Sequence, residues 1–166
     1  MYQRILVPTD GSDISAVAAD AAVAFARAFG SELVALSIVP PEPVVLSAEG
    51  AMATSALDID VLLEQAQQYV QRIADAAAKD GVKCRTLTGY AFSPADEIVE
   101  VAKREGCDLI FMSSHGRRGL SRLIAGSVAQ RVLAYSPVPV MVYRPQPAGA
   151  HAGPAPPPPG ARAAAG

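Results

Sequence analysis

The sequence predicts an α/β fold, a doubly wound parallel sheet of five strands in the order 3-2-1-4-5 with helices on both faces. Short apolar runs alternate four times with longer segments of helical periodicity, and a fifth apolar run follows. Glycines that suit the end of a helix stand at positions 30, 81 and 106, before the second, third and fourth runs. Repeated strand and helix pairs require right-handed crossovers, which make the strands parallel and cover both faces of the sheet.

The composition predicts one domain. The chain has 166 residues, of which 51% are hydrophobic and 18% charged, enough for one sizeable core and not two. We expect this domain to span residues 1–144. Residues 145–166 are rich in Pro, Ala and Gly, and because such a composition cannot build a core, we expect a disordered or polyproline-like tail.

The first strand is predicted from Tyr2 to Pro8, around the apolar run Ile5-Leu6-Val7. It stops at a cluster of turn and cap residues, Thr9-Asp10-Gly11-Ser12. Apolar residues then recur at helical spacing as far as Phe29, and Gly30 supplies a left-handed stop. Ser12 and Asp13 are equal candidates for the cap of this helix.

The second strand is predicted from Leu33 to Val39, ended by the prolines that follow it. Residues 44–55 show no clear period, which predicts a loop beside the carboxyl end of this strand that is able to cover a ligand. A long helix follows and is closed by Asp80-Gly81. Its apolar positions are Leu62, Ala66, Tyr69, Ile73 and Ala77.

The third strand is predicted from Val82 to Thr88, where alternating polarity indicates a half-exposed strand near the sheet edge. Ser93-Pro94 has the residue types of a cap followed by the first position of a helix, which Gly106 ends. The fourth strand, Leu109 to Met112, is apolar throughout and therefore reads as buried.

The last predicted helix runs from Ser127 to Tyr135, and Ser127 and Gln130 have the spacing of a capping box. The fifth strand is predicted from Val138 to Tyr143. It contains Pro139, and proline belongs at the edge of a sheet. Because an apolar edge strand is an aggregation hazard unless another copy covers it, we expect a homodimer through Val138 to Tyr143.

The strand order places the carboxyl ends of the first and fourth strands together at the topological switch point, where open α/β sheets bind ligands. This brings Asp10 close to the loop from Ser113 to Ser127. A helix that starts at Ser127 offers free amides and a positive dipole end to an anion. Gly116, Gly126 and Ser127 are candidates to hold phosphate oxygens through backbone amides and one hydroxyl.

Other candidate residues surround this point. Pro8 and Val39 offer apolar surface to a base. Asp10 has three candidate roles: to accept from a ribose hydroxyl, to help hold a divalent ion, or to cap the next helix. His115 is expected to orient the loop by a hydrogen bond in preference to acid-base chemistry, because nothing at readable spacing serves as its partner.

The segment from Met112 to Val128 resembles the universal stress protein family, in the branch with the ATP-binding fingerprint Gly-x2-Gly-x9-Gly-Ser/Thr. Gly116, Gly126 and Ser127 match this fingerprint, and Ser113 stands where the first glycine is found. The resemblance spans roughly Met1 to Arg144. It implies ATP with Mg or Mn as the cofactor, and it adds Met112 and Val128 as backbone contacts to the nucleotide.

Ser113 leaves two alternatives open. If the fingerprint glycine lets a phosphate or ribose approach the backbone, the serine side chain obstructs it. If the position has ordinary strand dihedrals, serine is tolerated. The first alternative favours a nucleotide-free dimeric interaction module, and the second a stress protein that binds ATP as a regulatory or sensing ligand.

Several functional classes are excluded or disfavoured. The net charge of -2 offers no general attraction to nucleic acid or to an anionic membrane. Cys84 and Cys107 are far apart in apolar segments, which predicts reduced core thiols. A Gly-x4-Gly-Lys-Ser/Thr motif is absent, so the chain is not a P-loop NTPase. We expect a cytoplasmic protein without catalytic residues and, at most, slow ATP hydrolysis.

Overall fold

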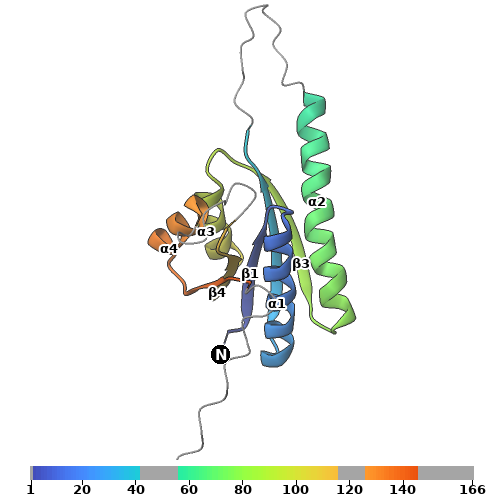
Figure 1. Cartoon of the computed structure of the whole chain (residues 1–166), viewed down its shortest axis with the longest axis vertical. Helices are drawn as coiled ribbons and strands as arrows, with labels where there is room; N and C mark the ends of the chain where they lie inside the picture. Colours follow the sequence, from blue (N-terminus) through green and yellow to red (C-terminus); the bar gives the residue numbers. More distant parts are fainter. Residues whose placement is uncertain (1, 42–55, 116–125, 146–166) are drawn as a thin grey trace, which may run out of the picture.

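The computed structural model describes residues 2–41, 56–115 and 126–145, with the side chains of residues 56–58 left out of the description (Figure 1). Strands and helices alternate along the chain. Their bounds are β1 Arg4–Thr9, α1 Asp13–Phe29, β2 Glu32–Val39, α2 Ala56–Lys79, β3 Cys84–Tyr90, α3 Pro94–Arg104, β4 Leu109–Ser113, α4 Ser127–Tyr135 and β5 Val140–Tyr143.

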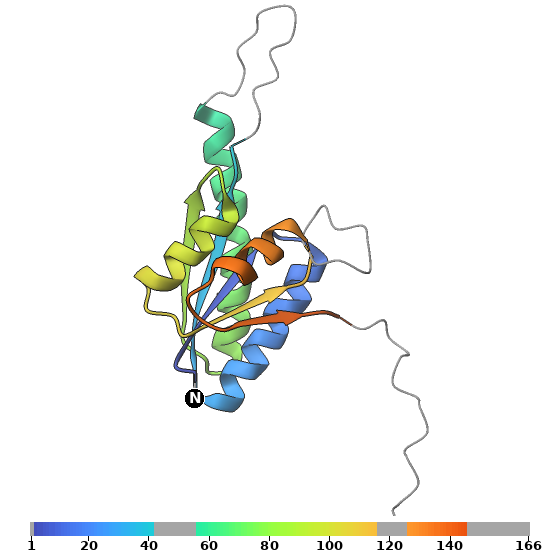
Figure 2. The ribbon, with the colours of Figure 1, turned by 90° about the vertical axis from the view of Figure 1, so that its left-hand side faces the viewer.

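The five strands form one parallel sheet in the order β3-β2-β1-β4-β5, which confirms the predicted fold class and strand order. Figure 2 shows β4 and β5 running side by side, with the helices covering the sheet. The first and fourth strands are central neighbours, with Ile5 opposite Leu109 and Leu6 opposite Ile110. The switch point between the carboxyl ends of β1 and β4 is therefore present.

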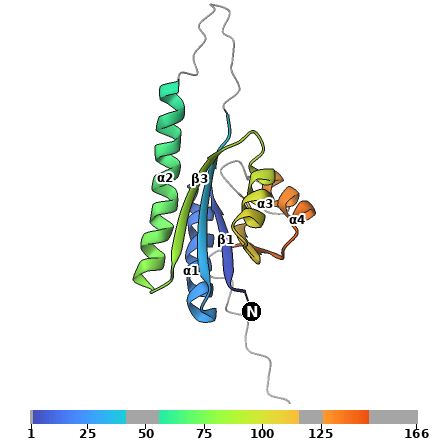
Figure 3. The same ribbon diagram turned by 180° about the vertical axis from the view of Figure 1, so that it is seen from behind.

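The two faces of the sheet carry separate cores. Helices α1 and α2 cover one face, and α3 and α4 cover the other (Figure 3). Alternate residues of β1 serve the two sides, because Ile5 and Val7 pack beneath α1 and α2 while Leu6 packs beneath α3 and α4. All three side chains are buried, as expected for a central strand of a parallel sheet with both faces covered.

The predicted boundaries of β3 are wrong by two residues at each end. Val82 is buried against α2, and its amide donates to the carbonyl of Ala77 at 2.8 Å. It therefore belongs to the turn that ends α2, and the ladder with β2 starts at Cys84. At the other end the ladder continues to Tyr90, opposite Val39, because the prolines that end β2 come only after that residue.

The fifth strand starts at Val140, two residues later than predicted. The Ser136 hydroxyl donates to the carbonyl of Val138 at 2.7 Å and accepts from its amide, so Val138 is held in a turn. Pro139 has no amide to donate, although its carbonyl accepts from Ile110 at 3.0 Å. β5 lies at the edge of the sheet, as the proline predicted.

The glycines at positions 30, 81 and 106 have φ values of 69°, 70° and 65°, which confirms their left-handed role after α1, α2 and α3. Across residues 2–41, 56–115 and 126–145, the structure has no helix with the length and apolar character needed to cross a membrane. The tail predicted over 145–166 lies almost wholly outside these residues, as does the loop predicted over 44–55.

Candidate functional site

The loop after β1 is an internally bonded turn. Asp10 Oδ1 accepts from the amide of Ser12 at 3.1 Å and from its hydroxyl at 2.6 Å. Ser12 is the cap of α1, since its Oγ accepts from the amide of Ser15 at 3.3 Å. Of the roles predicted for Asp10, the structure thus shows a contact that positions the capping residue, while the direct cap is Ser12.

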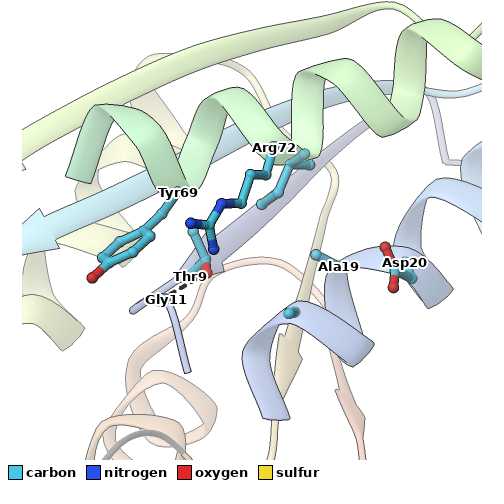
Figure 4. Close-up of a pocket in the computed structure, with 8 residues that line it drawn as sticks. Thr9, Gly11, Ala19, Asp20, Tyr69 and Arg72 are labelled. Carbon is cyan, nitrogen blue, oxygen red and sulfur yellow. Dashed lines mark hydrogen bonds between the residues drawn. The ribbon is translucent and has the colours of Figure 1, made fainter. Parts of the chain in front are cut away.

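Gly11 brings this loop into contact with α2. Its φ is 77°, and a Cβ atom built on it would lie 2.3 Å from Cζ of Tyr69. The tyrosine ring therefore lies directly against the glycine (Figure 4). This contact could not be expected from the sequence, because a glycine that accommodates a distant ring looks the same as one that serves a turn.

A small cavity of about 60 Å³ lies beside this contact, between α1 and α2. Figure 4 shows the side chains of Thr9, Asp20, Tyr69 and Arg72 around it. Its volume is far below the roughly 300 Å³ of small-molecule sites, and it lies on the α1 and α2 side of the loop. We therefore do not identify it with the predicted nucleotide site.

The predicted base-binding residues differ in their exposure. Pro8 is half-buried near the end of β1, whereas Val39 is only 8% exposed at the end of β2. Met112 is 6% exposed and packs in the core beneath α3 and α4. Its side chain faces away from solvent, so only its main chain is available for the contact that the resemblance implied.

Ser113 is the last residue of β4, where it pairs with Tyr143. None of the described residues other than glycine has a positive φ, so the backbone at Ser113 does not require a glycine. Its hydroxyl donates to the carbonyl of His115 at 2.7 Å. The side chain that replaces the fingerprint glycine is thus bonded within its own loop.

Ser114 joins the end of β4 to β5 and to the start of α4. Its amide donates to the carbonyl of Tyr143 at 3.0 Å, and its carbonyl accepts from the amide of Gly126 at 2.8 Å. The start of α4 is thereby held against the end of β4. The amide of Gly126 is used in this bond, and the phosphate contact expected of Gly126 stays a prediction. Gly116 lies outside the described residues.

The predicted capping box at Ser127 is also wrong. The cap of α4 is Gly126, with φ -59° and ψ 155°, and Ser127 is the first helical residue. Within the part of the chain that the structure describes, no side chain caps this helix, and the amide of Gln130 bonds to the carbonyl of Gly126 at 2.9 Å. Ser127 is exposed and Val128 is half-buried. The first turn of α4 therefore keeps amides that no capping side chain satisfies.

An ion pair connects the start of α3 to the middle of α4. Arg131 binds Asp96 with two bonds, Nε to Oδ1 at 2.8 Å and Nη2 to Oδ2 at 3.1 Å. The hydrogen bonds from Arg131, and then that from Ser93, hold the pKa of the Asp96 carboxyl below its ordinary value. Asp96 also lies in the first turn of α3, where a negative charge is favoured by the helix dipole.

The described residues contain no group of three or more His, Cys, Asp or Glu side chains arranged to hold a metal ion. Of the predicted site residues, the structure brings Ser113, Gly126, Ser127 and Val128 together around the peptide of Ser114. Pro8 and Asp10 lie at the same edge of the sheet, in and after the neighbouring strand β1. The residues that sequence reasoning missed are Gly11, Tyr69 and Ser114.

Comparison with known proteins shows which family and fold this chain resembles. The sequence model of the universal stress protein family matches residues 1–144. The universal stress protein MJ0531 of Methanocaldococcus jannaschii is 40% identical over 147 residues, covering 87% of this chain and 83% of that protein. The solved structure of MJ0577, another protein of that organism, matches with a TM-score of 0.75 and 29% identity, covering 89% of this chain and 99% of the other.

Two further solved structures share the fold and carry a nucleotide. A universal stress protein in complex with cAMP matches with a TM-score of 0.64 and 24% identity, over 86% of this chain and 97% of that one. The universal stress protein from Archaeoglobus fulgidus in complex with dAMP matches with a TM-score of 0.61 and 21% identity, over 86% and 98%. At these identities the likeness shows a common fold.

Proposed function

Since this chain belongs to the universal stress protein family, we propose that it binds ATP, with Mg or Mn, at the carboxyl ends of β1 and β4 as a regulatory or sensing ligand. The observation that carries the proposal is the start of α4, which has no side-chain cap and is bonded to Ser114 at the switch point of the sheet. Complexes of the same fold with cAMP and dAMP support an adenine nucleotide as the ligand class.

The phosphates fit the first turn of α4. An uncapped helix start presents amides and the positive end of the helix dipole, both of which favour an anion. Because the Gly126 amide is bonded to Ser114, we assign the phosphate contacts to the amides of Ser127 and Val128 and to the exposed Ser127 hydroxyl. Gly116 remains a proposed contact on the strength of the fingerprint alone.

We place the base and the ribose on the β1 and β2 side of the switch point. Pro8 gives half-exposed apolar surface, and the end of β2 at Val39 lies one strand further along the sheet. Asp10 offers carboxylate oxygen to a ribose hydroxyl or to the metal ion. Mg²⁺ is usually held by one or two carboxylates together with substrate phosphates. The single carboxylate of Asp10 is therefore enough as the protein's ligand to the metal ion.

We assign no catalytic residue. Asp10 Oδ1 accepts from the Ser12 hydroxyl, and His115 Nδ1 lies 3.0 Å from the Ser114 hydroxyl, so we assign both side chains to holding their loops and not to acid-base chemistry. The proposed role is therefore binding, with hydrolysis slow or absent. We place this function in the cytoplasm, with no nucleic acid or membrane as a partner, in line with the net charge of -2.

The proposal includes a homodimer through residues Val138 to Tyr143. All four residues of β5 are only partly buried in the single chain, and no other described strand pairs with the outer side of β5. A second copy pairing along this edge would cover both the apolar side chains and the free backbone groups. Sedimentation should give twice the mass of one chain at micromolar concentration, and the mass of one chain would contradict the dimer.

Titration calorimetry with ATP and Mg tests the main proposal. Saturable binding below millimolar nucleotide is expected, and absence of binding at that concentration would rule it out. Native mass spectrometry of the purified protein gives an independent check, since a tightly held nucleotide adds its mass to the chain.

The bonded Ser113 side chain favours a second candidate, a nucleotide-free dimeric interaction module. Ser113 fills the place of the first fingerprint glycine, and its hydroxyl is committed to His115. If the side chain closes the site, Ser113→Gly should create or sharply improve ATP affinity. If serine is tolerated, the wild-type protein binds ATP and the variant changes the affinity little.

A further inference from the structure

The main chain of β5 is bonded to β4 through alternate residues. The carbonyl of Pro139 accepts from the amide of Ile110 at 3.0 Å, and the carbonyl of Tyr143 accepts from the amide of Ser114 at 3.0 Å. In a strand, the amide and carbonyl of one residue point to one side, and those of the next residue point to the other side. Met141, halfway between Pro139 and Tyr143, therefore also directs its amide and carbonyl to β4.

The outer edge of β5 is formed by the main chain of two valines. By the same alternation, the amides and carbonyls of Val140 and Val142 point away from β4, to the side where no other described strand pairs with β5. Two donors and two acceptors thus lie in a row, on a strand whose four residues carry no charge. An uncharged strand edge of this kind is suited to pairing with another strand.

The side chains of β5 are divided between the two faces of the sheet. Met141 and Tyr143 pack against the core beneath α1 and α2, whereas Val140 packs against the core beneath α3 and α4. The ring of Tyr143 is stacked on that of Phe111, with the centroids 6.1 Å apart. Phe111 is also the β4 residue opposite Met141, and it is 3% exposed. The apolar surface over Phe111 therefore continues to the outer edge of the sheet, where Met141 and Tyr143 are half-buried.

A second copy of this chain fits the edge by symmetry. A two-fold axis that pairs two like edges makes the strands antiparallel and keeps the same face of both sheets on the same side. Residues directly opposite each other in an antiparallel pair share a face of the sheet. Because the side chains of β5 alternate between faces, the axis must pass through a residue position and not between two positions.

One such alignment pairs all the outward groups of β5 within β5 itself. Centred on Met141, it sets Val140 opposite Val142 of the partner subunit twice, and each pair exchanges two hydrogen bonds. Centred on Val140, it would require Val138, whose amide and carbonyl are both bonded to the Ser136 hydroxyl. Centred on Val142, it would pair Val140 with a residue beyond the end of the strand.

We infer that the partner on the outer edge of β5 is a second copy whose β5 runs antiparallel in the alignment centred on Met141. The inference rests on the homodimer proposed above and gives it a register. Met141 then lies opposite Met141 of the partner subunit, on the α1 and α2 face, in a pair without main-chain hydrogen bonds whose Cα atoms are about 4.5 Å apart. The two methionine side chains join the apolar surface over Phe111 in one copy to that in the other.

Opposite charges at position 141 test this register. Met141→Glu and Met141→Lys each set two like charges opposite each other, so either protein alone should sediment as a single chain at micromolar concentration. An equimolar mixture should sediment with the mass of two chains, because each mixed pair sets a glutamate against a lysine. Val61→Glu is the control, since Val61 is 53% exposed on α2, and it should remain a dimer.

Disulfide cross-linking shows which residues lie opposite each other. In a Cys84→Ser background, where the remaining Cys107 is buried, Met141→Cys should form a covalent dimer with a mild thiol oxidant, because a Cα separation of about 4.5 Å suits a disulfide. Val142→Cys should not cross-link with itself, but it should cross-link with Val140→Cys when the two proteins are mixed. Cys84→Ser alone should give no covalent dimer.

The outcomes separate the register from the homodimer on which it rests. A wild-type mass of two chains together with a self-cross-linked Val142→Cys would overturn the register and leave the homodimer standing. Dimeric Met141→Glu, or a mixture of the Glu and Lys variants that stays at the mass of one chain, would do the same. A wild-type mass of one chain would overturn both, and it would leave the nucleotide site to its own titration.

Discussion

The ring of Tyr69 lies against the backbone of Gly11, so close that a Cβ atom on Gly11 would stand 2.3 Å from Cζ. Helix α2 is thereby packed directly on the loop that carries Asp10. Any side chain at position 11 must displace the ring, and its φ of 77° adds the strain of the left-handed region.

Gly11→Ala should therefore destabilise the protein by about 2–4 kcal/mol, from overpacking together with the left-handed backbone. The unfolding temperature should fall by about 2–4 °C for each kcal/mol in a chain of this length. Gly30→Ala is the matched control, because its φ is 69° but nothing lies within 4 Å of the added atom. It should cost only about 1 kcal/mol.

A double variant separates the steric part of this cost from the backbone part. If the clash with Tyr69 matters, Gly11→Ala in a Tyr69→Ala background should cost about as much as Gly30→Ala. Equal costs for Gly11→Ala in both backgrounds would contradict the steric explanation.

The side chain of Asp108 connects the beginning of β1 to the beginning of β4 through hydrogen bonds. Its two carboxylate oxygens accept from the amides of Gln3 at 2.7 Å and Arg4 at 3.0 Å. Asp108→Ala removes both bonds and should lower the free energy of unfolding by about 1–2 kcal/mol in a urea titration. Asp75→Ala, which removes a single contact from Gln71 on the exposed face of α2, should change it by less than about 0.5 kcal/mol.

The Asp96 and Arg131 pair predicts a pH effect of definite sign. Because Arg131 lowers the pKa of Asp96 in the folded protein, the pair stabilises the fold above the ordinary pKa of 3.8. This contribution is lost as the pH falls below that value and through the lower folded pKa. The difference in unfolding temperature between wild type and Arg131→Gln should therefore be largest near neutral pH and shrink in acid.

High salt gives the control for this pH effect. Both side chains are about half exposed, so added salt should screen the pair and reduce the difference between the two proteins at neutral pH. A difference that grows as the pH falls would contradict the assigned sign.

Local sequence signals predicted most of the fold. The ends of three helices were predicted from Gly30, Gly81 and Gly106, because a left-handed residue is needed there. The edge position of β5 was predicted from Pro139, because proline has no amide hydrogen to donate. The errors occurred where a hydrogen bond outside the regular helix and strand patterns decides the local structure. Val82 joins a helix-end turn through Ala77, and the Gly126 amide bonds to Ser114, twelve residues earlier in the chain.

The candidate site likewise has a part that the sequence predicted and a part that it did not. The order of the strands placed Asp10 and Ser113 at one edge of the sheet, since topology follows from the repeated pattern. The roles of Gly11 and Ser114 depend on how α2 and α4 dock. A glycine or a serine in a loop has the same local signature whether or not another element packs on it, so the sequence left these two residues unassigned.

The buried thiol of Cys107 predicts a difference in chemical reactivity within the chain. Cys107 is 5% exposed, and burial raises its pKa to about 11. Only the thiolate is nucleophilic, so a thiol reagent at neutral pH meets both a steric barrier and a very small thiolate fraction. In Cys84→Ser, where Cys107 is the remaining cysteine, the folded protein should resist labelling for the time of the experiment.

The same variant in denaturant should label with one equivalent, because the unfolded thiol regains an ordinary pKa and is accessible. The slow labelling rate under native conditions would then report the opening of the core beneath α3 and α4, where Cys107 packs. Rapid stoichiometric labelling of folded Cys84→Ser would mean that this core opens readily, against the close packing seen around Cys107.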